Sequence, residues 1–350
     1  MKTLIRTFSL LASLGLAAIA TANPAATSLT GAGATFPYPI YSKWFDTYHE
    51  KTGIEINYQS IGSGGGIQQI KAGTVDFGAS DAALSDARLK EMPRRILHFP
   101  TVGGAVVLAY NLPSVRRPLQ LTSQIISGIY MGKITTWNNK MIAAANPGVA
   151  LPGAPILPVH RSDGSGTTNI FTTYLSAVNG PWKEMVGANT SVSWPVGIGA
   201  KGNEGVSGTI RQSQGAIGYV ELAYAKQNKL PVAHVRNRSG HFIEPTIAST
   251  TAAAEGAASM LARDIRFPIV NSPAPGAYPI CGLTFLLVYQ DQKDAAKAQA
   301  LAGFIRWAIH EGQAVAPTLD YAPLPQAVVK VDEANLRRLT IAGKPLLANR

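Results

Sequence analysis

The sequence has little cysteine and little charge, and both shortages narrow what the protein can be. Cys281 is the single cysteine among 350 residues, which excludes a disulfide framework, a cysteine-cluster zinc site and a thiolate-held iron–sulfur cluster. Charged residues make up 15% of the chain and hydrophobic residues 46%, so the chain can bury a large core and is not disordered. Its length suits two domains of roughly 100–200 residues each.

Familiar catalytic and nucleotide-binding signatures are missing as well. No G-x-x-x-x-G-K-[ST] segment is present, so the chain has no Walker A loop. Ser165 lies in Asp163-Gly164-Ser165-Gly166 and lacks the G-x-S-x-G context of a hydrolase nucleophile. The six histidines show no metal-ligand spacing. We therefore expect no catalytic residue, no metal and no cofactor.

The N-terminus has the three parts of a secretory signal peptide. Residues 1–7 carry Lys2 and Arg6, residues 8–20 are mostly apolar, and Ala20-Thr21-Ala22 is a small-x-small cleavage site. The apolar run is too short to span a bilayer comfortably, and no cysteine directly follows it to carry a lipid anchor. We expect cleavage after Ala22, which leaves residues 23–350 as an exported protein.

The formal net charge of +11 is unevenly distributed. Residues 105–274 hold 14 basic and 7 acidic side chains, whereas residues 23–104 are neutral and residues 275–350 carry +2. Basic residues stand singly or in pairs such as Arg94-Arg95, Arg116-Arg117 and Arg337-Arg338, and aromatic residues do not interleave with them. This pattern does not favour a nucleic-acid partner. A basic middle segment can instead help to attract a small anion.

Strand-like and helix-like segments alternate along the chain, which indicates an α/β protein with a largely parallel sheet. Residues 101–109 and 283–289 are continuous apolar runs typical of strands buried on both faces. Other strands are expected at residues 28–33, 55–59, 76–79, 156–160 and 216–221, and helices at residues 38–51, 67–72, 85–92, 123–131, 165–178, 203–214, 293–311 and 326–341.

Three turns repeat one arrangement, in which a strand leads through glycine and hydroxyl residues into a helix. They are residues 30–36 (TGAGATF), 61–66 (IGSGGG) and 161–168 (RSDGSGTT). A helix N-terminus presents free N–H groups and partial positive charge, glycines allow close approach, and hydroxyls add donors. One such turn is weak support for a site, but three turns, one of them opened by Arg161, predict an anion-binding site.

The same turns carry a family resemblance. The stretches LTGAGATFP (29–37), VDFGASD (75–81), FPTVG (99–103), DGSGT (163–167) and GAIGYVE (215–221) closely resemble the periplasmic phosphate-binding proteins of high-affinity phosphate ABC transporters. The likeness runs from about residue 28 to about residue 329. It implies a two-lobed periplasmic-binding-protein fold of type II, with a mixed sheet and flanking helices in each lobe and the ligand between the lobes. The implied lobes are residues 23–104 plus 275–350 (lobe I) and residues 105–274 (lobe II).

The resemblance also implies which residues contact inorganic phosphate. Asp163 would orient Arg161, and Gly64 stands where some members carry a second serine. The implied phosphate contacts are Thr35, Phe36, Ser63, Asp81, Arg161, Ser165, Gly166 and Thr167.

Phosphate chemistry fits these residue types. Phosphate near neutral pH offers oxygens that need donors and at least one proton that needs an acceptor, which Asp81 supplies when ionised. Sulfate has no such proton and would face Asp81 as a like charge. Arsenate is protonated like phosphate, so Asp81 does not select against it.

The resemblance implies a monomeric binding protein that delivers phosphate to the membrane permease subunits of an ABC transporter. Two alternatives stay open at this point. One is an exported phosphatase with Ser165 or Asp81 as nucleophile, which would need an adjacent base or a metal cluster. The other is a binder of another oxyanion such as arsenate.

Overall fold

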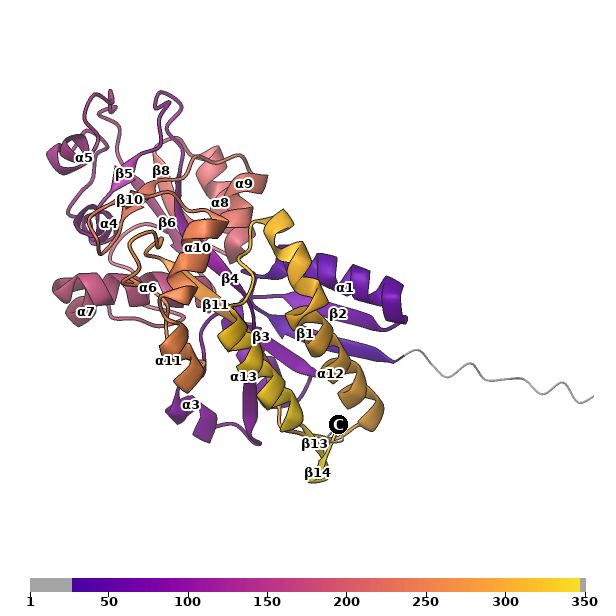
Figure 1. The fold of residues 1–350 in the computed structure, drawn as a ribbon. Helices are drawn as coiled ribbons and strands as arrows, with labels where there is room; N and C mark the ends of the chain where they lie inside the picture. The colour runs from indigo at the N-terminus through magenta and orange to yellow at the C-terminus, as the bar shows by residue number, and fades with distance from the viewer. Residues whose placement is uncertain (1–26, 347–350) are drawn as a thin grey trace, which may run out of the picture.

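One mixed sheet of eight strands organises the protein, and helices cover it on both sides (Figure 1). The computed structural model describes residues 27–346, so the predicted signal peptide lies outside the described residues. The strand order is β2-β1-β3-β11-β4-β8-β6-β7. The strands are β1 (Ser28–Gly33), β2 (Glu55–Ser60), β3 (Phe77–Ser80), β4 (Ile96–Tyr110), β6 (Leu157–Arg161), β7 (Ile198–Ala200), β8 (Ala216–Glu221) and β11 (Cys281–Tyr289).

The long strands β4 and β11 connect the two halves of the sheet. Every residue of both strands is buried, and they pair with each other antiparallel. β4 pairs with β11 up to Ala105 and with β8 from Val106 onward. The pairs β1–β2, β1–β3, β6–β7 and β6–β8 are parallel. The α/β prediction is therefore confirmed, although the strands between the parallel halves run antiparallel.

Aromatic packing holds the first half together. Helices α1 (Tyr38–Thr52) and α12 (Ala295–Ile309) meet through Phe45 and Phe304, whose ring centroids lie 5.4 Å apart. Tyr48 contacts Trp307 at 5.5 Å. Because α12 comes from the C-terminal part of the chain, this contact joins two distant segments into one body, and Figure 1 shows both helices beside β1 and β2.

A second aromatic cluster supports the other half. Phe171 stacks on Tyr219 at 4.4 Å, and Tyr130 contacts Phe171 at 5.0 Å. These residues come from α6 (Gly166–Val178), β8 and α4 (Ser123–Tyr130). The Tyr219 hydroxyl also accepts a hydrogen bond from the Arg161 N–H at 3.0 Å and lies 2.6 Å from the Thr168 hydroxyl. The core thus fixes the turn that follows β6.

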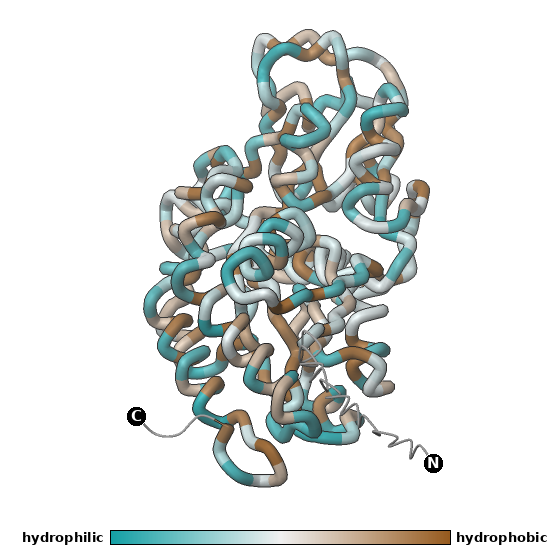
Figure 2. Tube along the Cα trace, turned by 90° about the vertical axis from the view of Figure 1, so that its right-hand side faces the viewer, coloured by the Kyte–Doolittle hydropathy of each residue, from teal (hydrophilic) through white to brown (hydrophobic). Residues whose placement is uncertain are grey.

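Shorter elements complete the fold. Figure 2 shows an elongated outline, and hydrophilic (teal) and hydrophobic (brown) residues alternate along the peripheral helices, as expected for amphipathic helices. The helices are α2 (Ser63–Ala72), α3 (Asp86–Lys90), α5 (Lys140–Ala145), α7 (Gly180–Met185), α8 (Gly202–Gln212), α9 (Leu222–Gln227), α10 (Ile247–Glu255), α11 (Ala258–Arg263), α13 (Gln326–Arg337) and a 3-10 helix η1 (Glu311–Leu319). The short strands are β5 (Gln120–Leu121), β9 (His234–Arg236), β10 (Phe242–Ile243), β12 (Asp291–Gln292), β13 (Thr340–Ile341) and β14 (Lys344–Pro345). None of the helices within residues 27–346 has the length and hydropathy needed to cross a membrane.

Several predicted elements begin earlier than expected, and the differences are largest for α2 and β4. Helix α2 starts at Ser63 rather than at residue 67, so the glycine run forms its first turn. Gly66 is required there, because a Cβ would lie 2.5 Å from the Gly33 Cα and 2.6 Å from the Ala32 carbonyl oxygen. Strand β4 begins at Ile96 rather than at residue 101, and its pairing with β11 shifts register between Thr284 and Phe285.

The predicted lobe boundaries stay a prediction. The change of strand partner between Ala105 and Val106 falls one residue after the first predicted boundary, which lies between residues 104 and 105. Near the second boundary, α11 packs against α13, which belongs to the other predicted lobe.

Candidate functional site

The three predicted turns meet at one place. Strands β1, β2 and β3 are parallel neighbours, so Thr35, Ser63 and Asp81, which follow their C-terminal ends, lie at the same edge of the sheet. All three side chains are buried. The turn after β6 faces them from the other half of the sheet.

Direct hydrogen bonds join the facing turns. The Gly166 N–H donates to the Ser63 Oγ at 3.0 Å, and the Gly64 N–H donates to the Gly164 carbonyl oxygen at 2.8 Å. The backbones are so close that a Cβ on Gly166 would lie 2.5 Å from the Asp81 Oδ2. The two halves of the molecule are therefore in a closed arrangement.

Arg161 is held in position by Asp163. Its Nε donates to the Asp163 Oδ1 at 2.8 Å and its Nη2 to the Oδ2 at 2.5 Å. Nη1 donates to the Thr167 Oγ1 at 3.3 Å. Burial alone would raise the pKa of Asp163, but the hydrogen bonds and charge of Arg161 and the Gly202 N–H hold it below its usual value. Asp163 therefore stays ionised and orients the guanidinium in the way the resemblance implies.

Ser165 and Phe36 have structural contacts of their own. The Ser165 Oγ accepts the Thr168 N–H at 3.0 Å and caps α6. The Phe36 ring is fully buried. The backbone carbonyl oxygen of Phe36 accepts a hydrogen bond from the Tyr321 hydroxyl at 2.6 Å. Within the described chain, the backbone N–H groups of Thr35, Phe36 and Thr167 have no acceptor. Unpaired N–H groups beside a helix start are the donors that an anion uses.

Asp81 is the acid at the centre of this arrangement. The Thr284 hydroxyl donates to its Oδ1 at 2.7 Å, and the Asp81 N–H donates to the Ser63 Oγ at 3.3 Å. Burial raises the pKa of Asp81 to about 7, although the Thr284 hydrogen bond, the Arg161 charge and Ser63 oppose the shift. The carboxyl group can therefore hold or release a proton near neutral pH.

Sequence reasoning missed Asn203 and Thr284. Asn203 is fully buried, and its Nδ2 donates to the Thr35 Oγ1 at 2.8 Å and to the Thr167 Oγ1 at 3.2 Å. Its Oδ1 accepts the Glu221 N–H at 2.9 Å. The sequence signals for Asn203 are weak, since it follows a lone glycine at a helix start. Thr284 lies inside the apolar strand β11, and its hydroxyl group was the one feature of the sequence that could have indicated a polar role.

The alternatives from the sequence gain no support from these contacts. Among the described residues, no histidine or carboxylate bonds the Ser165 hydroxyl, which is the partner that an activated nucleophile needs. No group of three or more potential metal ligands occurs within residues 27–346. The arrangement supplies hydrogen-bond donors, one guanidinium and one titratable acid, which suits the binding of a protonated anion.

Comparison with known proteins first defines the class. A model of the PBP superfamily domain matches residues 18–311. The solved structure of a phosphate-binding protein from Stenotrophomonas maltophilia superposes with a TM-score of 0.69 at 20% identity, covering 91% of this chain and 96% of that one. The fold and the facing turns thus define a two-lobed periplasmic binding protein, as the resemblance predicted.

The family follows from the curated relatives. The phosphate-binding protein PstS of Xylella fastidiosa is 47% identical over 307 residues, which cover 87% of this chain and 84% of the relative. The PstS protein of Haemophilus influenzae is 43% identical, covering 91% and 93% of the two chains. The chain belongs to the PstS family of phosphate-binding proteins, and the predicted resemblance is confirmed.

Proposed function

We propose that this protein captures inorganic phosphate between its two lobes and hands it to the membrane subunits of an ABC-type permease, without chemistry on the ligand. The observation that carries the proposal is the closure of Gly166 and Ser63 around Asp81, which places a titratable acid among hydrogen-bond donors. The names of the PstS relatives, which describe phosphate binding, support it.

The proposed ligand contacts are the residues that the resemblance implies. Thr35, Phe36 and Thr167 offer unpaired N–H groups, and Arg161 offers a guanidinium already aligned by Asp163. Ser63, Asp81, Ser165 and Gly166 complete the proposed set. Because Asp163 balances the charge of Arg161, the anion is held mainly by directed donors rather than by net positive charge.

Asp81 makes the site selective for anions that carry a proton. One proton has to lie between the Asp81 carboxyl and the ligand, because two bare anions in a buried site repel each other. Phosphate brings that proton at neutral pH. Sulfate cannot, so it binds only when Asp81 itself is protonated, which becomes rarer above a pKa of about 7.

The remaining proposals concern the location of the protein, its oligomeric state and its lobes. We place the protein in the periplasm after removal of residues 1–22, as a monomer with lobe I formed by residues 23–104 plus 275–350 and lobe II by residues 105–274. Closure on phosphate would present both lobes together to the permease, because the ligand binds the closed state more tightly than the open one.

The test is the pH dependence of sulfate binding, measured by calorimetry on phosphate-free protein. Sulfate affinity is expected to fall about tenfold per pH unit above pH 7 and to level off below it, since only the protonated form of Asp81 accepts sulfate. Asp81→Asn should remove this dependence and reduce the preference for phosphate. An unchanged preference in Asp81→Asn, with the same pH profile, would overturn the role of Asp81.

A further inference from the structure

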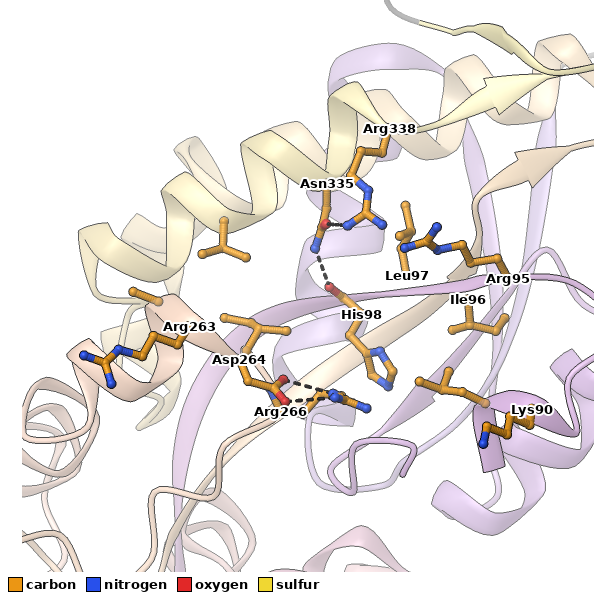
Figure 3. Close-up of a pocket in the computed structure, with 14 residues that line it drawn as sticks. Lys90, Arg95, Ile96, Leu97, His98, Arg263, Asp264, Arg266, Asn335 and Arg338 are labelled. Carbon is orange, nitrogen blue, oxygen red and sulfur yellow. Dashed lines mark hydrogen bonds and ion pairs between the residues drawn. The ribbon is translucent and has the colours of Figure 1, made fainter. Parts of the chain in front are cut away.

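A groove away from the facing turns collects positive charge. It has a volume of about 550 Å³ and lies between α3, the start of β4, the segment after α11, and α13. Its cations are Lys90, Arg95, Arg263, Arg266 and Arg338, and Asp264 is its single acid (Figure 3). Apolar side chains including Leu89, Ile96 and Val331 line it as well. Low-dielectric walls beside charges of one sign strengthen the field inside a groove.

Most of these cations lack an acidic partner. Arg266 is paired with Asp264 and Asp86, at 2.8 and 2.6 Å. Within residues 27–346, Lys90, Arg95, Arg263 and Arg338 form no salt bridge.

Among these cations, Arg95 and Arg338 are placed so that one anion could contact both. Figure 3 shows both guanidinium groups on the same side of the groove, beside Asn335. The Asn335 Oδ1 accepts a hydrogen bond from the Arg338 Nη1 at 2.9 Å, while its Nδ2 donates to the His98 carbonyl oxygen at 3.2 Å. This fixes the direction of the Arg338 side chain. Partial burial and the charge of Arg95 both lower the pKa of Arg338, as expected for two cations that no anion separates.

The overall charge of the chain explains only part of this concentration, because Arg263 and Arg266 come from the basic segment 105–274 but the other three cations do not. The basic excess lies in residues 105–274, whereas residues 23–104 and 275–350, which supply Lys90, Arg95 and Arg338, are close to neutral. Arg95 and Arg338 come from the two arginine pairs Arg94-Arg95 and Arg337-Arg338, and the fold brings one member of each pair to the groove.

We propose that this groove is a second anion site, which binds a multivalent phosphate anion larger than orthophosphate, with Arg95 and Arg338 as its anchors. Two arginine forks match the oxygens of neighbouring phosphoryl groups, and a bridging anion relieves the repulsion between them. A groove of about 550 Å³ lies within the size range of small-molecule sites and leaves room for several phosphoryl groups. Its concave shape favours a free polyanion over a flat membrane surface.

The experiment uses the full exported protein with orthophosphate added until the interlobe site is saturated, as shown by a first titration. Tripolyphosphate is then titrated calorimetrically. We expect one further site, with affinity reduced about tenfold or more in Arg95→Gln/Arg338→Gln, because each lost charge-assisted bond is costly. The control Arg211→Gln/Arg337→Gln removes the same charge from exposed positions that do not line the groove and should bind tripolyphosphate within about twofold of the parent.

Three results would overturn the proposal. These are no tripolyphosphate binding to the saturated protein, equal loss of affinity in both double variants, and capture by anionic vesicles without binding of soluble tripolyphosphate. Because the first titration reports the interlobe site separately, a failure of the proposed phosphate capture is distinguished from a failure of the groove.

Discussion

Asn203 joins residues of both predicted lobes through a single side chain. Thr35 lies 168 residues away in the sequence, yet its Oγ1 accepts both the Asn203 N–H at 3.2 Å and the Nδ2 at 2.8 Å. The same Nδ2 reaches Thr167 on the third turn. A buried amide with this many partners is costly to remove, because each partner loses its hydrogen bond in a place that water does not reach.

We therefore expect Asn203→Ala to weaken phosphate binding by about tenfold or more. The reason is that Thr35 and Thr167 lose the donor that holds their hydroxyls in position. Calorimetry measures the affinity. Asn138→Ala, at an exposed position, is the control and should bind phosphate like the parent, whereas parent-like affinity in Asn203→Ala would show that the amide is dispensable.

Asp332 gives a second residue-scale prediction, on stability. Both of its carboxylate oxygens are buried without a hydrogen-bond partner in the described chain, and burial raises its pKa well above the usual value. The folded state therefore binds more protons than the unfolded state between the unfolded pKa and the raised one. In that window the free energy of unfolding falls as pH rises, by up to about 1.4 kcal/mol per unit for one group.

Asp332→Asn cannot titrate, so its stability relative to the parent should improve as pH rises above the ordinary pKa of an aspartate, because burial raises the pKa of Asp332 in the folded state. Denaturant unfolding at several pH values measures this. Glu50→Gln, at an exposed position, controls for general charge effects. A difference between Asp332→Asn and the parent that does not change with pH would contradict the raised pKa.

At the scale of elements, the residues that meet between the facing turns were predictable where a sequence motif contained them, although their contact with a ligand stays a prediction. In the turns 30–36, 61–66 and 161–168, the glycine and hydroxyl residues predict hydrogen-bond donors, and this prediction needs no knowledge of the tertiary structure. Asn203 and Thr284 were not predictable, because their importance lies in partners contributed by distant strands and helices. The start of α2 was misplaced for a related reason. Glycine disfavours helices, and only the backbone of β1, which excludes a Cβ at Gly66, explains its use there.

The close approach of α6 to the opposite turns yields an element-scale prediction. A Cβ on Gly166 would lie 2.5 Å from the Asp81 Oδ2 and 2.6 Å from the Ser63 Oγ, so Gly166→Ala should obstruct closure and weaken phosphate binding by about tenfold or more. The fold should persist, since alanine is the better helix former.

Gly208→Ala is the matched control within a helix, because nothing lies within 4 Å of its added Cβ. It should bind phosphate normally. Calorimetry reports both affinities and thermal unfolding reports both stabilities. Parent-like binding by Gly166→Ala would mean that the closed contact between α6 and Ser63 is not used.

At the scale of the whole molecule, the two buried strands β4 and β11 connect the two halves of the sheet. The continuous apolar runs in the sequence predicted them, and the α/β class followed from the alternation of segments. The groove that collects Arg95 and Arg338 was not predictable. The sequence showed the arginine pairs that contain them, but only the packing of α13 beside the start of β4 brings Arg95 and Arg338 to one groove.

The central claim is that the closed arrangement of the three turns binds phosphate and rejects sulfate. Its most direct test is a calorimetric titration of phosphate-free protein at about pH 8, above the pKa of about 7 that burial gives Asp81, first with sulfate and then with phosphate. The proposed site predicts tight binding of one phosphate per chain and a sulfate affinity about tenfold below its value at low pH, so that phosphate binds much more tightly than sulfate. Equal binding of both anions would contradict the selective role of Asp81, and binding of neither would contradict phosphate capture itself.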